Sequence, residues 1–128
     1  MVKQPEKQTG LDKTVAGVLG EITWLATQSP RHKALFIYDL EWLVMPAIIL
    51  KQFKMFYKGD RPVGCILWGK VSDDVAARLE QPNFRLKPQE WRSGPHIKII
   101  DIIAPFGAEE ELKAQFMAGL DRDSNEIN

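Results

Sequence analysis

Hydrophobic positions in the first quarter of the chain recur with the period of a helix. Five apolar residues stand three or four positions apart: Val15, Val18, Leu19, Ile22 and Leu25. This spacing predicts an amphipathic helix, which ends before Pro30 because proline cannot continue the backbone hydrogen-bond ladder. Residues 33–52 predict a second helical stretch. Pro46 either ends it, kinks it, or lies in the first turn of a following short helix.

The pattern changes to alternation after this point. Residues 52–57 alternate between polar and apolar side chains, and residues 62–71 form a second apolar run. Residues 58–61 between them read Lys-Gly-Asp-Arg, which is typical of a tight turn. The two runs therefore predict an antiparallel β-hairpin.

The last third of the chain predicts a further strand between two helices. Residues 96–103 predict the strongest strand of the chain, and near its end Asp101 interrupts the apolar run. Ser72 is the expected N-cap of a short helix over residues 73–79, and residues 108–120 have helical spacing. The order helix, helix, hairpin, short helix, strand, helix predicts an α/β domain of the layered α+β type.

Polarity at the two ends sets the expected domain boundaries. Residues 1–14 are polar and predict a flexible lead-in, residues 15–120 a single domain, and residues 121–128 a polar tail. Residues 1–14 lack the apolar core of a signal peptide. The longest apolar stretch, residues 40–50, is too short to span a membrane.

Composition narrows the classes of function. The 128 residues include 17 basic and 17 acidic side chains, so the formal net charge is zero. This balance predicts no nucleic-acid partner. Cys65 is the only cysteine, so no internal disulfide is possible, and no Cys/His cluster has the spacing of a metal site. We expect a cytoplasmic protein without a metal, because a lone thiol suits a reducing compartment.

Two residues stand out as candidates for chemistry. His32 follows a helix-ending Ser-Pro pair; an imidazole can transfer protons near neutral pH, although a loop histidine is also commonly a surface or capping residue. Asp101 lies inside an apolar strand, where a buried carboxylate costs several kcal/mol unless it is paired. It lies either on a solvated face of the strand or at a functional site. Gly107 is a weaker candidate, as a source of backbone N–H groups for an oxyanion.

Other conspicuous residues predict structure rather than catalysis. His96 begins a strand and is expected to be solvated. The four tryptophans are typical of a core or of the wall of an apolar groove. The chain has no P-loop, no Gly-x-Gly-x-x-Gly and no Gly-x-Ser-x-Gly sequence.

Several blocks of sequence are distinctive in combination. The most distinctive are Ser-Pro-x-His at residues 29–32 and Asp-x-x-Ala-Pro-Phe-Gly at residues 101–107. Four further blocks are Leu-Gly-Glu-Ile-Thr-Trp-Leu at 19–25, Met-Pro-Ala-Ile at 45–48, Arg-Pro-Val-Gly at 61–64 with Trp68, and Trp-Arg-Ser-Gly at 91–94. In their order and approximate spacing, these blocks resemble one known family, the RTX toxin-activating lysine acyltransferases.

The resemblance implies a fold similar to GCN5-type N-acetyltransferases, shortened at the C-terminus. It implies a cytoplasmic enzyme that moves a fatty acyl group from acyl carrier protein to the ε-amino groups of internal lysines in a protoxin. His32 is then the base, or a transient acyl acceptor, and Asp101 orients it. The implied substrate-binding residues are Ser29, Trp68, Ser93, Gly94 and Gly107. No tightly bound cofactor is implied, and a homodimer is expected because an incomplete sheet exposes unpaired edge groups.

Two alternatives stay open at this stage. One is a weakly catalytic relative that binds an acyl carrier or a protein partner without turnover. It is favoured by Leu43, which stands where the family commonly has a polar Asn, and by the end of the chain soon after Leu120. The other is a CoA-dependent N-acetyltransferase of small amines. The Arg/Gln-x-x-Gly-x-Gly/Ala loop of such enzymes is absent after the strand over residues 96–103.

Overall fold

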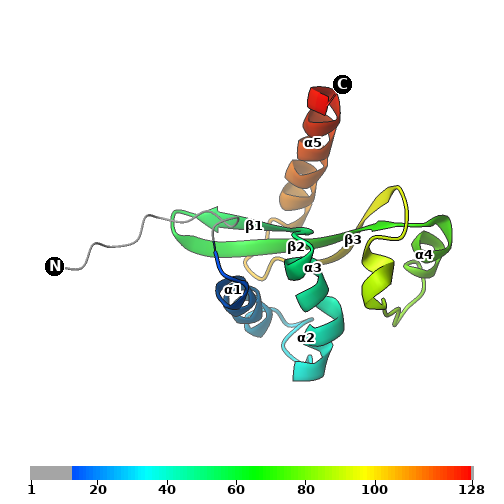
Figure 1. Ribbon diagram of the computed structural model, residues 1–128. Helices are drawn as coiled ribbons and strands as arrows, with labels where there is room; N and C mark the ends of the chain where they lie inside the picture. The colour runs from blue at the N-terminus through cyan, green and yellow to red at the C-terminus, as the bar shows by residue number, and fades with distance from the viewer. Residues whose placement is uncertain (1–12, 128) are drawn as a thin grey trace.

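The computed structural model describes residues 13–127, with side chains through residue 121, so most of the predicted lead-in lies outside the described residues. Within these described residues, six helical segments and three strands follow one another, and Figure 1 shows how they are arranged. They are α1 Val15–Thr27, α2 Ile37–Leu43, α3 Met45–Ile49, β1 Phe53–Lys58, β2 Arg61–Val71, α4 Asp73–Arg78, the 3-10 helix η1 Pro88–Trp91, β3 His96–Ile103 and α5 Glu109–Ile127.

The strands form one antiparallel sheet in the order β1-β2-β3. β1 and β2 make the predicted hairpin, in which Lys58 pairs with Arg61 across a two-residue turn. Gly59 occupies this turn with φ +64°, a conformation that glycine adopts at little cost. β3 has the bounds predicted from its apolar run.

The sheet separates two layers of helices, as Figure 1 shows. α1, α2 and α3 pack on one face, where Ile22, Leu25 and Leu67 are among the fully buried side chains. α5 stands on the other face and packs its N-terminal half there through Leu112 and Phe116. The layered α+β class is therefore confirmed, and the larger core lies on the face covered by three helices.

The second helical stretch differs from its prediction. It begins at Ile37 rather than at residue 33 and is divided at Val44 into α2 and α3. Pro46 lies in the first turn of α3, the third of the outcomes that the sequence left open. Residues 33–36 are not helical because the preceding chain forms a tight turn around Ser29.

The first and last helices have contacts or turns beyond the residues whose apolar spacing predicted them. Thr14 caps α1 by accepting from the Gly17 N–H, and Lys13 pairs with Glu21, so the folded part begins before Val15. α5 continues beyond Leu120 to Ile127. A helix that projects into solvent needs no apolar stripe there, so hydrophobic spacing could not reveal its end. Within residues 13–127, no helix is both long and apolar enough to cross a membrane.

Candidate active site

A tight turn between α1 and α2 brings Ser29 and His32 together. The His32 N–H donates to the Ser29 carbonyl at 3.0 Å, with Pro30 at the second position, where its fixed φ favours such a turn. This geometry places the Ser29 hydroxyl 2.6 Å from Nδ1 of His32. Both side chains are buried, with 5% and 6% of their surfaces exposed.

Asp101 on β3 holds the other nitrogen of the same ring. Its Oδ2 lies 2.9 Å from His32 Nε2, and its Oδ1 accepts from the Ile102 N–H at 2.9 Å. An ionised carboxylate can only accept, so Nε2 is the donor in this contact, and whenever the imidazole is neutral Nδ1 accepts from the Ser29 hydroxyl. Both nitrogens of His32 are therefore engaged, and the lone pair available for a proton faces the serine hydroxyl.

A bulge in β3 directs Asp101 toward the helices. Leu67 of β2 pairs with Asp101, whereas the next residue, Trp68, pairs with Ile99, so Ile100 is an extra residue. Ile100 packs in the core on the α1 side, and Asp101 reaches His32 on that same side. Consecutive side chains of a regular strand point to opposite faces; the bulge breaks this alternation, as bulges near active sites often do.

Arg31 ties the histidine turn to the end of β3. Its Nη2 donates to the Ile102 carbonyl at 2.8 Å and to Glu109 of α5 at 3.2 Å. The guanidinium thus joins the turn, β3 and the start of α5. Sequence reasoning did not single out Arg31, although it lies inside the Ser-Pro-x-His block.

Cys65 is an ionisable group close to the pair. It pairs with Ile103 in the sheet and is fully buried. Burial, with a smaller contribution from the Asp101 charge, raises the pKa of this thiol far above its ordinary value. Cys65 is therefore a packing residue rather than a nucleophile. Among the side chains described, those of residues 13–121, no group of three His, Cys, Asp or Glu lies close enough to hold a metal ion.

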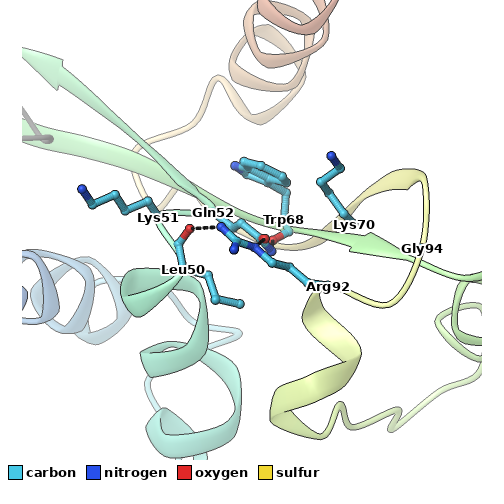
Figure 2. A pocket seen from close by; sticks show the side chains of 7 residues that line it. All are labelled: Leu50, Lys51, Gln52, Trp68, Lys70, Arg92 and Gly94. Atoms are coloured by element: carbon cyan, nitrogen blue, oxygen red, sulfur yellow. Dashed lines mark hydrogen bonds between the residues drawn. The ribbon is translucent and has the colours of Figure 1, made fainter.

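Three predicted substrate-binding residues lie at another place. Trp68 and Gly94 line an open pocket at the far end of β2 (Figure 2). The Ser93 side chain is engaged in hydrogen bonds within the protein, because its hydroxyl donates to the Glu90 carbonyl and accepts from the Ser72 N–H. Of the predicted substrate-binding residues, Ser29 therefore lies with the His32–Asp101 pair. Trp68, Ser93 and Gly94 lie elsewhere, near the end of β2.

Gly107 and Leu43 have structural explanations of their own. Gly107 has φ +96° in the loop between β3 and α5, and its N–H donates to the Ala104 carbonyl at 3.2 Å. Leu43 is buried in the core on the α1 side, so the apolar side chain at this position contributes packing.

Comparisons with known proteins give consistent results. The model of the RTX toxin acyltransferase family matches residues 12–124. The leukotoxin-activating lysine-acyltransferase LktC of Pasteurella haemolytica-like sp. (strain 5943B) is 35% identical over 95 residues, covering 74% of this chain and 58% of the relative. The RTX-II toxin-activating lysine-acyltransferase ApxIIC of Actinobacillus pleuropneumoniae is 37% identical over 90 residues, covering 70% and 56%.

A third relative carries a name that specifies an acyl group. The protein-lysine myristoyltransferase HlyC of Escherichia coli is 31% identical over 90 residues, which cover 70% of this chain and 53% of the relative. The chain thus spans little more than half the length of each of these three relatives.

Proposed function

Because the chain belongs to the RTX toxin acyltransferase family, we propose that it transfers a fatty acyl group to the ε-amino group of internal lysines in an RTX-type protoxin. The proposed donor is acyl carrier protein, which holds the acyl group as a thioester, and the proposed compartment is the cytoplasm. The observation that carries the proposal is the chain of contacts from Ser29 through His32 to Asp101.

The chemistry requires a base. A lysine is protonated at neutral pH, with an ordinary pKa near 10.4, and is then not nucleophilic. The ammonium first loses one proton to solvent, and His32 then accepts a second proton at Nδ1 as the neutral amine nitrogen attacks the thioester carbonyl. The new C–N bond forms, the C–S bond breaks, and the proton passes to the departing thiolate. The products are an amide and a free thiol.

Ser29 and Asp101 have different parts in this proposal. Asp101 holds Nε2–H and stabilises the imidazolium that forms during the reaction, as carboxylates do in other triads. Ser29 occupies Nδ1 in the resting state, so the lysine proton reaches the ring through the serine hydroxyl or after this hydroxyl turns away. Ser29 is therefore a positioning residue or a proton relay.

The experiment is acyl transfer to a protoxin fragment. The full chain is incubated with acyl carrier protein loaded with a myristoyl group, and acylated lysines are located by mass spectrometry. Transfer that disappears in His32→Ala supports the proposal, whereas undiminished transfer would overturn the site. Activity with acyl-CoA but not with the loaded carrier would mean that acyl-CoA, rather than acyl carrier protein, is the donor.

The proposed assembly is a homodimer. Within the described residues β3 is an edge strand, so one side of it carries unpaired N–H and C=O groups, and such edges readily pair with another chain. Light scattering coupled to size-exclusion chromatography measures the mass. A monomer at micromolar concentration would overturn this assignment.

A further inference from the structure

A cationic pocket lies at the end of β2, beyond the residue where β1 begins. It encloses about 660 Å³, and Figure 2 shows the side chains that surround it. The lining residues are Leu50, Lys51, Gln52, Trp68, Lys70, Arg92 and Gly94. Three of them are cationic and none is acidic. The proposed acyl transfer makes no use of these three charges.

Arg92 is held in this pocket by two hydrogen bonds to neutral groups, and it forms no ion pair with the side chains described over residues 13–121. Its Nε donates to Gln52 Oε1 at 2.9 Å, and its Nη2 donates to the Leu50 carbonyl at 3.1 Å. Gln52 is itself buried, and its amide NH₂ donates to the carbonyls of Trp68 and Trp91. Both acceptors of Arg92 are neutral, so the guanidinium keeps its full positive charge and three further N–H donors.

The segment that carries Arg92 fits closely against β2. The N–H groups of Ser93 and Gly94 both donate to the Lys70 carbonyl. A Cβ on Gly94 would lie 2.5 Å from Ser72 Cα, so only glycine allows this approach. The Trp-Arg-Ser-Gly block therefore builds one wall of the pocket.

Lys51, which lines the pocket, lies in the C-terminal cap of α3. It has φ +59° and follows α3, and the N–H groups of Lys51 and Gln52 return to the carbonyls of Ile48 and Ala47. This is the Schellman arrangement, in which glycine usually occupies the left-handed position. A lysine at this position adopts a left-handed backbone conformation that is less favourable for it than for glycine, and it places a positive charge at the rim of the pocket.

The two lysines have no acidic partner among residues 13–121, whose side chains the structure describes. Lys51 and Lys70 are exposed, and neither takes part in an ion pair within that range. Like charges gathered at one site repel each other and attract anions. In Figure 2 the two ammonium groups point in different directions, on either side of the Trp68 indole. They suit several carboxylates spaced along a segment better than one compact phosphate.

We infer that this pocket docks an acidic segment of a protein partner, with the Trp68 ring as its apolar wall. The inference rests on the proposed function, in which that partner is the acyl carrier protein. Leu67 and Trp68 belong to opposite layers of the core, so Asp101, which pairs with Leu67, lies across the sheet from Trp68. The pocket is therefore expected to govern binding of the partner rather than the chemical step.

The test measures the dissociation constant of the full chain for acyl carrier protein without an acyl group, by calorimetry at low and moderate salt. Lys51→Gly with Lys70→Gln removes both charges, and glycine suits the left-handed position, so this variant retains the fold. We expect binding at least tenfold weaker, with a smaller salt dependence. The matched control, Lys58→Gln with Lys98→Gln, removes two exposed lysines that do not line the pocket and is expected to remain within twofold of the parent.

Competition identifies the chemistry of the occupant. Displacement of the carrier by hexaglutamate, but not by the same concentration of inorganic phosphate, supports an acidic segment. Displacement by phosphate alone, equal weakening in the control, or absence of carrier binding would overturn the inference. Acyl transfer is assayed separately. If the carrier binds through the two lysines but no acyl group is transferred, the pocket is upheld and the proposed function is overturned. If transfer occurs but the double variant binds the carrier as tightly as the parent, the proposed function is upheld and the pocket is overturned.

Discussion

Both histidines of the chain place Nε2 beside an aspartate carboxylate, His32 at 2.9 Å from Asp101 and His96 at 2.5 Å from Asp73. Their surroundings differ. The His32 ring is 6% exposed and the Asp101 side chain 20%, whereas the second pair has 44% and 92% of its side-chain surfaces exposed. His32 has a second partner at Nδ1, the Ser29 hydroxyl.

The comparison shows that a contact between a histidine and an aspartate does not by itself make a preorganised site. Water competes for the exposed pair and screens its charges, so such a pair contributes little to stability. The buried ring is fixed from both sides, and charge–charge interactions around it are stronger because the local dielectric is lower. A short distance between a histidine and a carboxylate is therefore a poor indicator of function; the second hydrogen bond and the burial distinguish the two pairs.

The largest expected effect comes from removing each imidazole in turn. His32→Ala should lower the rate of lysine acylation by about 10²–10⁴-fold, the usual contribution of a general base. His96→Ala is the matched control and should change the rate less than twofold. Mass spectrometry of the acceptor lysines measures both rates. A comparable loss of the acylation rate in the two variants would contradict the difference in function between the two histidines.

The next effect concerns the two carboxylates. Asp101→Asn keeps the size of the side chain but removes the charge that stabilises the imidazolium, and we expect a loss of about 10²-fold or more in the transfer rate. Asp73→Asn should leave the rate unchanged, since Asp73 contacts an exposed ring. Full activity in Asp101→Asn would mean that the carboxylate only fills space.

A smaller effect is expected at Ser29. Ser29→Ala leaves Nδ1 of the buried ring without its donor, and the free energy of unfolding should fall by about 1 kcal/mol. A relay role predicts a roughly tenfold lower rate at saturating donor, with the KM for the donor unchanged. Urea denaturation and steady-state kinetics measure the two quantities. Ser29→Thr keeps the hydroxyl and should restore part of the rate, which a purely structural role would not require.

The smallest effect concerns Cys65, on the same side of the sheet as Asp101. Burial raises the pKa of this thiol, so the thiolate is scarce in the folded chain at pH 8. Iodoacetamide should modify Cys65 only after unfolding, as intact mass will report. The same protection is expected in Asp101→Asn, since burial contributes more than the Asp101 charge. Rapid labelling of the folded chain would indicate that this core opens.

Local pattern predicted much of the secondary structure. The apolar spacing identified α1, the hairpin and β3, since each buries one or both faces and so leaves a periodic trace. Ser72 was identified as an N-cap, and its hydroxyl does accept from the Val75 N–H. The extent of α5 and the irregular start of α2 escaped prediction because neither depends on apolar spacing.

The sequence by itself determined the layered α+β class, the family resemblance and the two residues, His32 and Asp101, on which the proposed chemistry depends. Only the tertiary structure decided how they meet. The bulge at Ile100 turns Asp101 toward the helices, and this break in alternation depends on pairing with β2, which no local pattern encodes. The cationic pocket likewise joins residues from three separate segments, because the chain must close on itself before their charges can gather.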